Sequence, residues 1–343
     1  MRKLRVLILV HSQLVPPPDL DPKTIDRFKT PYITEYDVMN YLKKVGHQVE
    51  VVGVYSDLRV IRDKVEEFRP HIVFNLLEEF DGETLFDQNV VSYLELLRVP
   101  YTGCNPRGLI LARDKALSKK ILSYHRIKSP KFHVFPKSRK PKISGKMKYP
   151  MIVKCLSEEA SLGISNASIV SSDEKLLERV KYIHKKFGVD AIAEQFIEGR
   201  EFYVGVYGNH QIKTLPVWEL SIDESQNPEK EIYTVRAKFS ASYRKEKGIR
   251  TDRAKIDEKL ERKIVDVCRK TYKALGLNGY ARIDLRIDSN ENIYIIEANP
   301  NPDISFDDEF AESAKYEKIK YPDLLEKILR MGISWFGGFP ETP

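Results

Sequence analysis

Cysteine and long apolar runs are scarce in this sequence of 343 residues. Its three cysteines, Cys104, Cys155 and Cys268, lie far apart, which excludes a disulfide framework and a cysteine-rich metal cluster and favours a reducing, cytoplasmic setting. No apolar stretch approaches the ~18–20 residues that span a bilayer, so no membrane partner is expected. The short apolar run 6–10 lacks the length and the cleavage site of a signal peptide and predicts a buried strand.

Several familiar catalytic motifs are missing as well. The sequence contains no GxxxxGK[ST] phosphate loop, GxGxxG turn, HExxH helix, CxxC pair or GxSxG elbow. The enzyme classes that depend on these five motifs therefore receive no support from the sequence.

What the sequence does contain is a globular composition with an excess of positive charge. Hydrophobic residues make up 42% and charged residues 31%, and 57 Lys and Arg face 50 Asp and Glu, for a net charge of +7. The segment 119–154 holds twelve basic residues and no acidic one, and 236–253 holds seven basic and two acidic residues. A charge run is usually a solvated face, and no aromatic-interleaved RNA motif accompanies it, so we expect no nucleic-acid partner.

Apolar strands alternate with helices in the first third of the chain. The strands are expected at 4–10, 47–54 and 71–76, and the helices at 34–45, 57–68 and 83–97. Strands that are apolar throughout are typical of a parallel sheet covered on both faces. We therefore predict an α/β domain at 1–110.

The pattern changes after residue 110 towards an α+β arrangement. We expect a helix from about 111 to 122, strands ending at 154 and spanning 190–196, 202–206 and 211–218, and helices at 173–187 and 257–275. The polar stretch 221–253 predicts a long loop, and 281–287 and 292–298 predict a strand pair.

The strongest local signal lies on that strand pair. Arg282 and Asp284 share one face of their strand, as do Glu297 and Asn299, because residues two apart point the same way. If the strands pair, two carboxylates and an amide oxygen converge near one Arg, a set that suits Mg²⁺ and phosphate. A cross-strand salt bridge with a strand-end Asn is the alternative, and spacing alone does not separate the two.

Two further segments carry weaker signals. Lys154 ends an apolar strand before the small-residue loop 158–163, where it either meets a phosphate or merely extends its ammonium from a strand end. The stretch 194–201 is either a hinge that binds an adenine edge, with Glu201 on ribose hydroxyls, or a hairpin with a charged tip.

Together these segments resemble the ATP-grasp superfamily, and within it the D-alanine–D-alanine ligase family. Six ordered matches carry the resemblance, namely PYTG at 100–103, DK at 114–115, YPMIVK at 149–154, the hinge at 194–202, YTVRAK at 233–238 and the strand pair with its Arg and acidic residues. The resemblance covers 74–305. It implies a preATP-grasp domain at 1–110, followed by a two-lobed ATP-grasp fold with a central subdomain at 111–205 and a catalytic subdomain at 206–343.

The resemblance also assigns roles to individual residues. The nucleotide would be held by Lys115, Lys154, Glu194, Gln195, Phe196, Ile197, Glu201 and Lys238. Asp284, Glu297 and Asn299 would bind Mg²⁺ or Mn²⁺, two ions in all. The catalytic set would be Arg282, which stabilises an oxyanion, Lys238 at the γ-phosphate, and Ser161 in the loop 158–163.

The implied activity is that of an ATP-dependent carboxylate–amine ligase, an acid–amino-acid ligase with small-molecule substrates. A carboxylate attacks ATP to form an acyl phosphate, an amine displaces phosphate, and the loop 221–253 keeps water out. On this view the two basic segments flank a polyphosphate. The competing interpretation is a nucleotide-binding protein without ligation, against which the retention of Arg282 argues.

The substrate residues depart from the family pattern. The N-terminal GGxSxE motif is missing, the loop 158–163 reads EEASLG where the family has EGSSxG, Phe239 stands where Tyr is usual, and Pro302-Asp303 replaces a Pro-Gly pair. We therefore predict a different amino-acid or peptide substrate and a product other than D-alanyl-D-alanine, with a true D-alanine–D-alanine or D-alanine–D-lactate ligase as the alternative. Candidate substrate contacts are His11, Glu35, Phe239, Asp303 and Ser305. The apolar tail 335–343 packs either on the core or on the partner of a homodimer.

Overall fold

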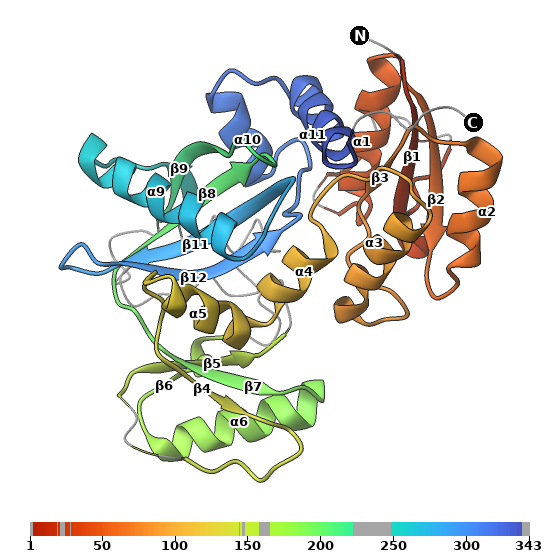
Figure 1. The fold of residues 1–343 in the computed structure, drawn as a ribbon. Coiled ribbons are helices and arrows are strands. Elements are labelled where there is room, and N and C mark those ends of the chain that lie inside the picture. The colour runs from red at the N-terminus through yellow and green to blue at the C-terminus, as the bar shows by residue number, and fades with distance from the viewer. Residues whose placement is uncertain are drawn as a thin grey trace.

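A computed structural model describes residues 3–18, 20, 25–27, 29–143, 145, 148–157, 165–221 and 248–337. Within these residues the chain forms three sheets, a parallel one at the N-terminal end and two antiparallel ones (Figure 1). This mixed architecture agrees with the predicted fold class. None of the described helices has the length and apolar character needed to cross a membrane.

The parallel sheet has the strand order β2-β1-β3 and helices on both faces. Its elements are β1 (Arg5–His11), α1 (Ile33–Lys44), β2 (Gln48–Val54), α2 (Arg59–Phe68), β3 (Ile72–Asn75) and α3 (Asp87–Leu96). Leu7 and Leu9 pack in one core cluster with residues of α2 and α3, whereas Val6, Ile8 and Val10 pack in another with α1 and α11 (Tyr321–Trp335). Because side chains alternate along a strand, an apolar strand buries both faces, as the sequence predicted.

A four-stranded antiparallel sheet, in the order β4-β7-β5-β6, forms the lobe at the bottom of Figure 1. It consists of β4 (Phe132–Phe135), β5 (Met151–Cys155), β6 (Ile169–Val170) and β7 (Ala191–Gln195), with α6 (Asp173–Phe187) packed on one face. The Ser172 side chain accepts a hydrogen bond from the backbone of Lys175, and Gly188 ends α6 at a φ of 72°. These caps explain why the predicted helix bounds are confirmed.

The five-stranded sheet has the order β10-β9-β8-β11-β12, all antiparallel. Its elements are β8 (Arg200–Tyr207), β9 (Lys213–Ser221), β10 (Arg250–Arg253), β11 (Tyr280–Ile287) and β12 (Ile293–Pro300), with α9 (Glu258–Ala274) and α10 (Glu309–Tyr316) packed against it. The predicted loop 221–253 was wrong at its end, where β10 pairs with β9, and residues 222–247 lie outside the part of the chain that the structure describes. β10 lies at the edge of the sheet and is held by backbone hydrogen bonds to β9. Its sequence is therefore free to be polar, and it lacks the apolar alternation by which a strand is recognised.

The helix expected at 111–122 is in fact two helices, α4 (Pro106–Arg113) and α5 (Lys115–Tyr124). The Asp114 carboxylate accepts hydrogen bonds from the backbone of Ala116 and Leu117, both at 2.9 Å, and so begins α5. At the other end of the chain, α11 returns to the N-terminal sheet, and the ring of Phe336 meets that of Tyr101 at 6.2 Å. The tail from 338 lies outside the described residues, and the division into domains at 110 and 205 remains a proposal.

Candidate active site

A cavity of about 860 Å³ opens where the three sheets face one another. Fourteen of the predicted site residues line it, namely His11, Glu35, Lys154, Glu194, Gln195, Phe196, Ile197, Glu201, Arg282, Asp284, Glu297, Asn299, Asp303 and Ser305. They come from segments up to 294 residues apart, so the tertiary fold brings together what the sequence only suggested. Ser161, Lys238 and Phe239 lie outside the described residues.

Two buried lysines share one buried carboxylate at the edge of this cavity. Lys119 Nζ lies 3.0 Å from Glu194 Oε1, and Lys154 Nζ lies 2.9 Å from Glu194 Oε2. Burial raises the pKa of Glu194, but the two ammonium groups lower it by more than burial raises it, so the net shift is downward. The pKa of Lys154 is lowered by burial and raised more by Glu194 and Glu297, which keeps its ammonium charged.

Lys119 is a site residue that the sequence interpretation missed. It lies one helical turn after Lys115 on α5, so both lysines point to the same side. Its ammonium also donates to the carbonyl of Ile296 at 2.7 Å, at the point where the pairing of β11 with β12 shifts register. Lys115 does not line the cavity. It is buried, with 6% of its surface exposed, and its positive charge lowers the pKa of Glu297. The DKxxxK spacing was the signal that could have found the pair.

The predicted strand pair is confirmed, with Arg282 opposite Asn299 and Asp284 opposite Glu297. The Arg282 guanidinium donates to both oxygens of Asp284, at 2.8 and 2.9 Å, so the salt-bridge alternative is also present. Asn299 Nδ2 donates to Asp284 Oδ2 at 3.0 Å and to Glu297 Oε1 at 3.5 Å. Both carboxylates therefore face one small space.

The charges around this space act on its two carboxylates in opposite directions. Burial raises the pKa of Glu297, but Lys115, Lys154 and Arg282 bring it down to about 2, so this carboxylate stays ionised. Burial raises the pKa of Asp284 to about 7 even though Arg282 lowers it, because Glu297 and Glu201 add to the rise. A cation placed between the carboxylates would relieve their repulsion, and hard oxygen donors of this kind fit Mg²⁺.

The hinge between β7 and β8 is held by Arg286, which the sequence interpretation also missed. Arg286 donates to the carbonyl of Ile197 at 2.8 Å, lies 3.2 Å from Glu201 Oε2 and stacks over the ring of Phe196 at 4.9 Å. The hydroxyl of Tyr203 donates to Glu201 Oε1 at 2.8 Å. Arg286 lies four residues after Arg282 on the same face of β11, so strand alternation was the signal that pointed to it.

The N-terminal side of the cavity carries the candidate substrate residues. His11 Nε2 lies 3.4 Å from Glu79 Oε1. Asp303 accepts hydrogen bonds from Thr34 Oγ1 and from the backbone of Ser305, both at 2.8 Å. This side lies against the N-terminal sheet, in the part of the chain whose sequence lacks the GGxSxE motif.

A family model described as "D-ala D-ala ligase C-terminus" matches residues 115–330. The chain belongs to the D-alanine–D-alanine ligase family. Among curated relatives, the D-alanine–D-alanine ligase of Carboxydothermus hydrogenoformans is 31% identical over 86% of this chain and 91% of its own. An uncharacterized protein of Sinorhizobium fredii, y4sG, is 32% identical over 75% of this chain and 73% of its own.

Solved structures of D-alanine–D-alanine ligase-family proteins share the ATP-grasp fold of this chain. The enzyme of Bacillus anthracis in complex with ATP superposes with a TM-score of 0.73 and 19% identity, over 97% of this chain and 99% of that one. The VanG D-Ala:D-Ser ligase of Enterococcus faecalis superposes with a TM-score of 0.70 and 17% identity, over 97% and 100% of the two chains. At these identities the likeness establishes the fold alone.

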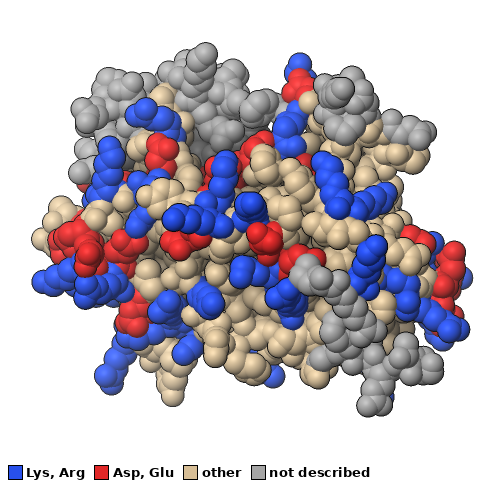
Figure 2. Space-filling view, turned by 90° about the horizontal axis from the view of Figure 1, so that it is seen from above, with Lys and Arg blue, Asp and Glu red and all other residues tan. Residues whose placement is uncertain are grey.

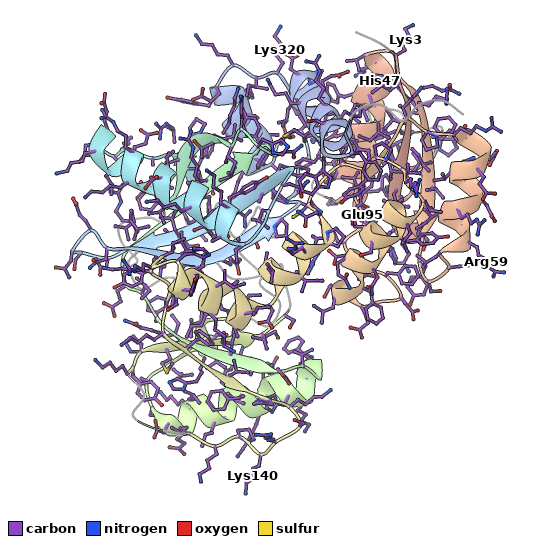
Figure 3. The ribbon with its side chains drawn as sticks, in the orientation of Figure 1. Lys3, His47, Arg59, Glu95, Lys140 and Lys320 are labelled. Carbon is purple, nitrogen blue, oxygen red and sulfur yellow. The ribbon has the colours of Figure 1, made fainter. Side chains whose placement is uncertain are left out.

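The structure also shows where the basic segment 119–154 lies in this family member. Its first and last lysines, Lys119 and Lys154, reach the site, whereas Lys140 points outward at the far end of the four-stranded lobe (Figure 3). On the face seen in Figure 2, Lys and Arg side chains are interleaved with Asp and Glu. Of these three lysines, only the two at the ends of the segment lie at the cavity, and the expectation that the segment flanks a polyphosphate stays a prediction.

Proposed function

We propose that this protein is an ATP-dependent ligase that joins a carboxylate to an amine, an acid–amino-acid ligase that uses a different amino-acid or peptide substrate and whose product is not D-alanyl-D-alanine. The observation that carries the proposal is the convergence of Lys154 and Glu194 with Arg282, Asp284 and Glu297 on one cavity. A polyphosphate needs cations on one side and a metal-binding carboxylate pair on the other, and this cavity offers both.

In the proposed reaction, a substrate carboxylate oxygen attacks the γ-phosphorus of ATP, and the bond from that phosphorus to the oxygen of the leaving ADP breaks. The amine nitrogen then attacks the acyl carbon, the carbon–oxygen bond to phosphate breaks, and the amine loses a proton. Lys154 would hold the polyphosphate. Arg282 would donate its N–H groups to the oxyanion that forms on the acyl carbon.

Asp284, Glu297 and Asn299 would hold the magnesium or manganese ions that the resemblance to the ATP-grasp superfamily implies. Bound there, the metal supplies positive charge to the polyphosphate. Asn299 now turns its amide nitrogen towards both carboxylates, so it would have to turn its oxygen inward to become a ligand. The number of ions, two, stays a prediction.

Arg286 would keep the hinge shaped for the adenine, because it fixes the carbonyl of Ile197 and the carboxylate of Glu201 at once. Glu201 would accept hydrogen bonds from the ribose. The roles of Lys238 at the γ-phosphate, of Ser161 and of the segment 221–253 in excluding water rest on the family resemblance.

A second candidate is a true D-alanine–D-alanine ligase, which the identity to the Carboxydothermus hydrogenoformans enzyme favours. Against it stand Asp303, which lines the cavity where the family has a glycine, and the missing N-terminal motif. The proposal includes a cytoplasmic location, with which the three buried free cysteines agree. It also includes a homodimer, which light scattering on the purified protein would test.

The deciding experiment measures ADP formation with pairs drawn from D- and L-amino acids, D-lactate and dipeptides. We expect ADP to form only when both a carboxylate and an amine are present, and D-alanine to be a poor substrate. Efficient turnover of D-alanine alone would establish the second candidate. ATP binding without amine-dependent ADP formation would contradict the ligase proposal and favour a nucleotide-binding protein.

A further inference from the structure

The carboxylate of Glu309 joins two strands of the five-stranded sheet that do not pair with each other. Its Oε1 accepts a hydrogen bond from Thr251 Oγ1 on β10 at 3.0 Å, and its Oε2 accepts one from Arg282 Nη1 on β11 at 3.2 Å. In the sheet, β9 and β8 lie between these two strands. Glu309 is the first residue of α10 and lines the cavity, so this bridge belongs to the wall of the candidate active site.

A glycine in β8 lets α10 come close enough to form this bridge. Gly205 lies opposite Arg282 in the pairing of β8 with β11, so the two residues share one face of the sheet. A Cβ at Gly205 would lie 2.7 Å from Leu215 Cδ1 and 3.0 Å from Phe310 Cε2, and these neighbours would have to move. Phe310 directly follows Glu309 and is buried. Its contact with Gly205 therefore places the start of α10 beside Arg282.

Arg282 and a metal ion would share the carboxylate of Asp284. Arg282 Nε donates to Asp284 Oδ1 and its Nη2 donates to Oδ2, which also accepts a hydrogen bond from Asn299. Three of the roughly four lone pairs of this carboxylate are thus in use. A metal ion bound there, as the proposed reaction requires, would draw on the negative charge that now balances the Arg282 guanidinium, whose side chain is 18% exposed.

Glu309 supplies a second carboxylate to the same guanidinium. It binds Nη1, whereas Asp284 binds Nε and Nη2, so the two carboxylates do not exclude each other. The guanidinium carbon lies over the ring of Tyr203, 5.0 Å from its centre, which supports the group from one side. A cation in a mostly buried position needs a counter-ion. With Glu309 in place, Arg282 keeps one counter-ion and its orientation while Asp284 binds a metal ion.

We propose that Glu309 is a positioning residue, which holds Arg282 in place and thereby makes Asp284 available to the metal ion. The proposal rests on the ligase function proposed above. Thr251 contributes through Glu309, because its hydroxyl orients the Glu309 carboxylate. Neither residue lies in a segment that carries the family resemblance. Loss of a group that orients metal ligands typically weakens metal binding by about 10–100-fold, so the role can be measured without catalysis.

Calorimetric titration of the full chain with an ATP analogue tests the proposal. The analogue carries a methylene bridge between the β- and γ-phosphates, so it is not cleaved, and its binding is measured at a series of Mg²⁺ concentrations. In Glu309→Gln, the Mg²⁺ concentration that gives half-maximal binding should rise by about 10-fold, because Arg282 then depends on Asp284 alone. Thr251→Val, a second variant in case the first does not fold, should give a smaller rise.

Glu312→Gln is the matched control, because it removes the same charge one turn further along α10, where Glu312 pairs with Lys315. Its Mg²⁺ requirement should equal that of the native protein. An unchanged requirement in Glu309→Gln, or an equal rise in Glu312→Gln, would overturn the proposal even if amine-dependent ADP formation sustains the ligase function.

Two other outcomes separate this inference from the ligase function on which it rests. A raised Mg²⁺ requirement in Glu309→Gln, together with no ADP formation from any pair of substrates, would sustain the role of Glu309 at a nucleotide site and overturn the ligase function. A native protein that binds no analogue at any Mg²⁺ concentration would overturn both.

Discussion

Arg282 donates from Nε and Nη2 to the two oxygens of Asp284, two residues along the same strand. Its Nη1 lies 3.2 Å from Glu309 Oε2, so three hydrogen bonds fix the plane of the guanidinium at the cavity wall. A lysine has the charge but not the fork that makes these bonds.

Arg282→Lys should therefore lower ADP formation by about 10²–10³-fold, the usual effect of losing an oxyanion donor. Single-turnover kinetics with saturating ATP would measure this. Arg200→Lys is the control, because Arg200 makes the same two-bond contact with Glu219 outside the cavity. Similar losses in both variants would show that the fork matters for the sheet and not for the chemistry.

Lys119 and Lys154 make equivalent contacts with Glu194 but differ in their access to the cavity, which only Lys154 lines. Removing one partner of a buried ion pair costs about 3–5 kcal/mol, so both Lys119→Met and Lys154→Met should destabilise the protein to a similar extent in urea unfolding. Only Lys154→Met should abolish ADP formation in the folded protein. Normal turnover by folded Lys154→Met would refute its role at the phosphates.

Glu297→Gln should remove a carboxylate that stays ionised in the site, its pKa being about 2. We expect ADP formation to be lost at ordinary Mg²⁺ concentrations and the Mg²⁺ requirement to rise by at least about 10-fold, since the amide is a weaker ligand for a hard cation. Removing the metal with EDTA should abolish turnover by the native protein. A Glu291→Gln variant, altered in the exposed turn between β11 and β12, should behave as the native protein.

Glu35 should make the free protein less stable as the pH rises. Its pKa is raised from 4.5 to about 7 in the fold by burial, with Glu78 and Asp303 facing it, so the folded state binds more protons than the unfolded state between these values. The free energy of unfolding therefore falls across this window. Glu35→Gln should remove up to about 3 kcal/mol of that fall, at 1.36 kcal/mol for each unit.

Urea unfolding at pH 5 and pH 8 would measure this effect in the absence of ligand. Glu66→Gln is the control, because it removes the same charge from an exposed position on α2 that pairs with Arg62, and it should keep the pH dependence of the native protein. A fall in stability that is unchanged in Glu35→Gln would mean that Glu35 keeps its ordinary pKa.

Local patterns were sufficient for much of the secondary structure. The helix at 173–187 was predictable because Ser172 and Gly188 cap it through contacts close in sequence. The break between α4 and α5 was signalled by Asp114, but continuous helical spacing concealed it. The strand β10 could not be read from its own residues, because its pairing with β9 depends on backbone groups rather than on side chains.

The sequence by itself determined the parallel α/β start, the pairing of Arg282 and Asp284 with Glu297 and Asn299, and the nucleotide-like segments around Lys154 and Glu194. These follow from alternation, caps and motifs, each of which acts over a few residues. Only the tertiary structure decided that Lys119 shares Glu194 with Lys154 and that Glu35 is buried at the cavity wall. The physical reason is that burial and charge pairing depend on residues distant in sequence, and no local pattern specifies which of them will meet.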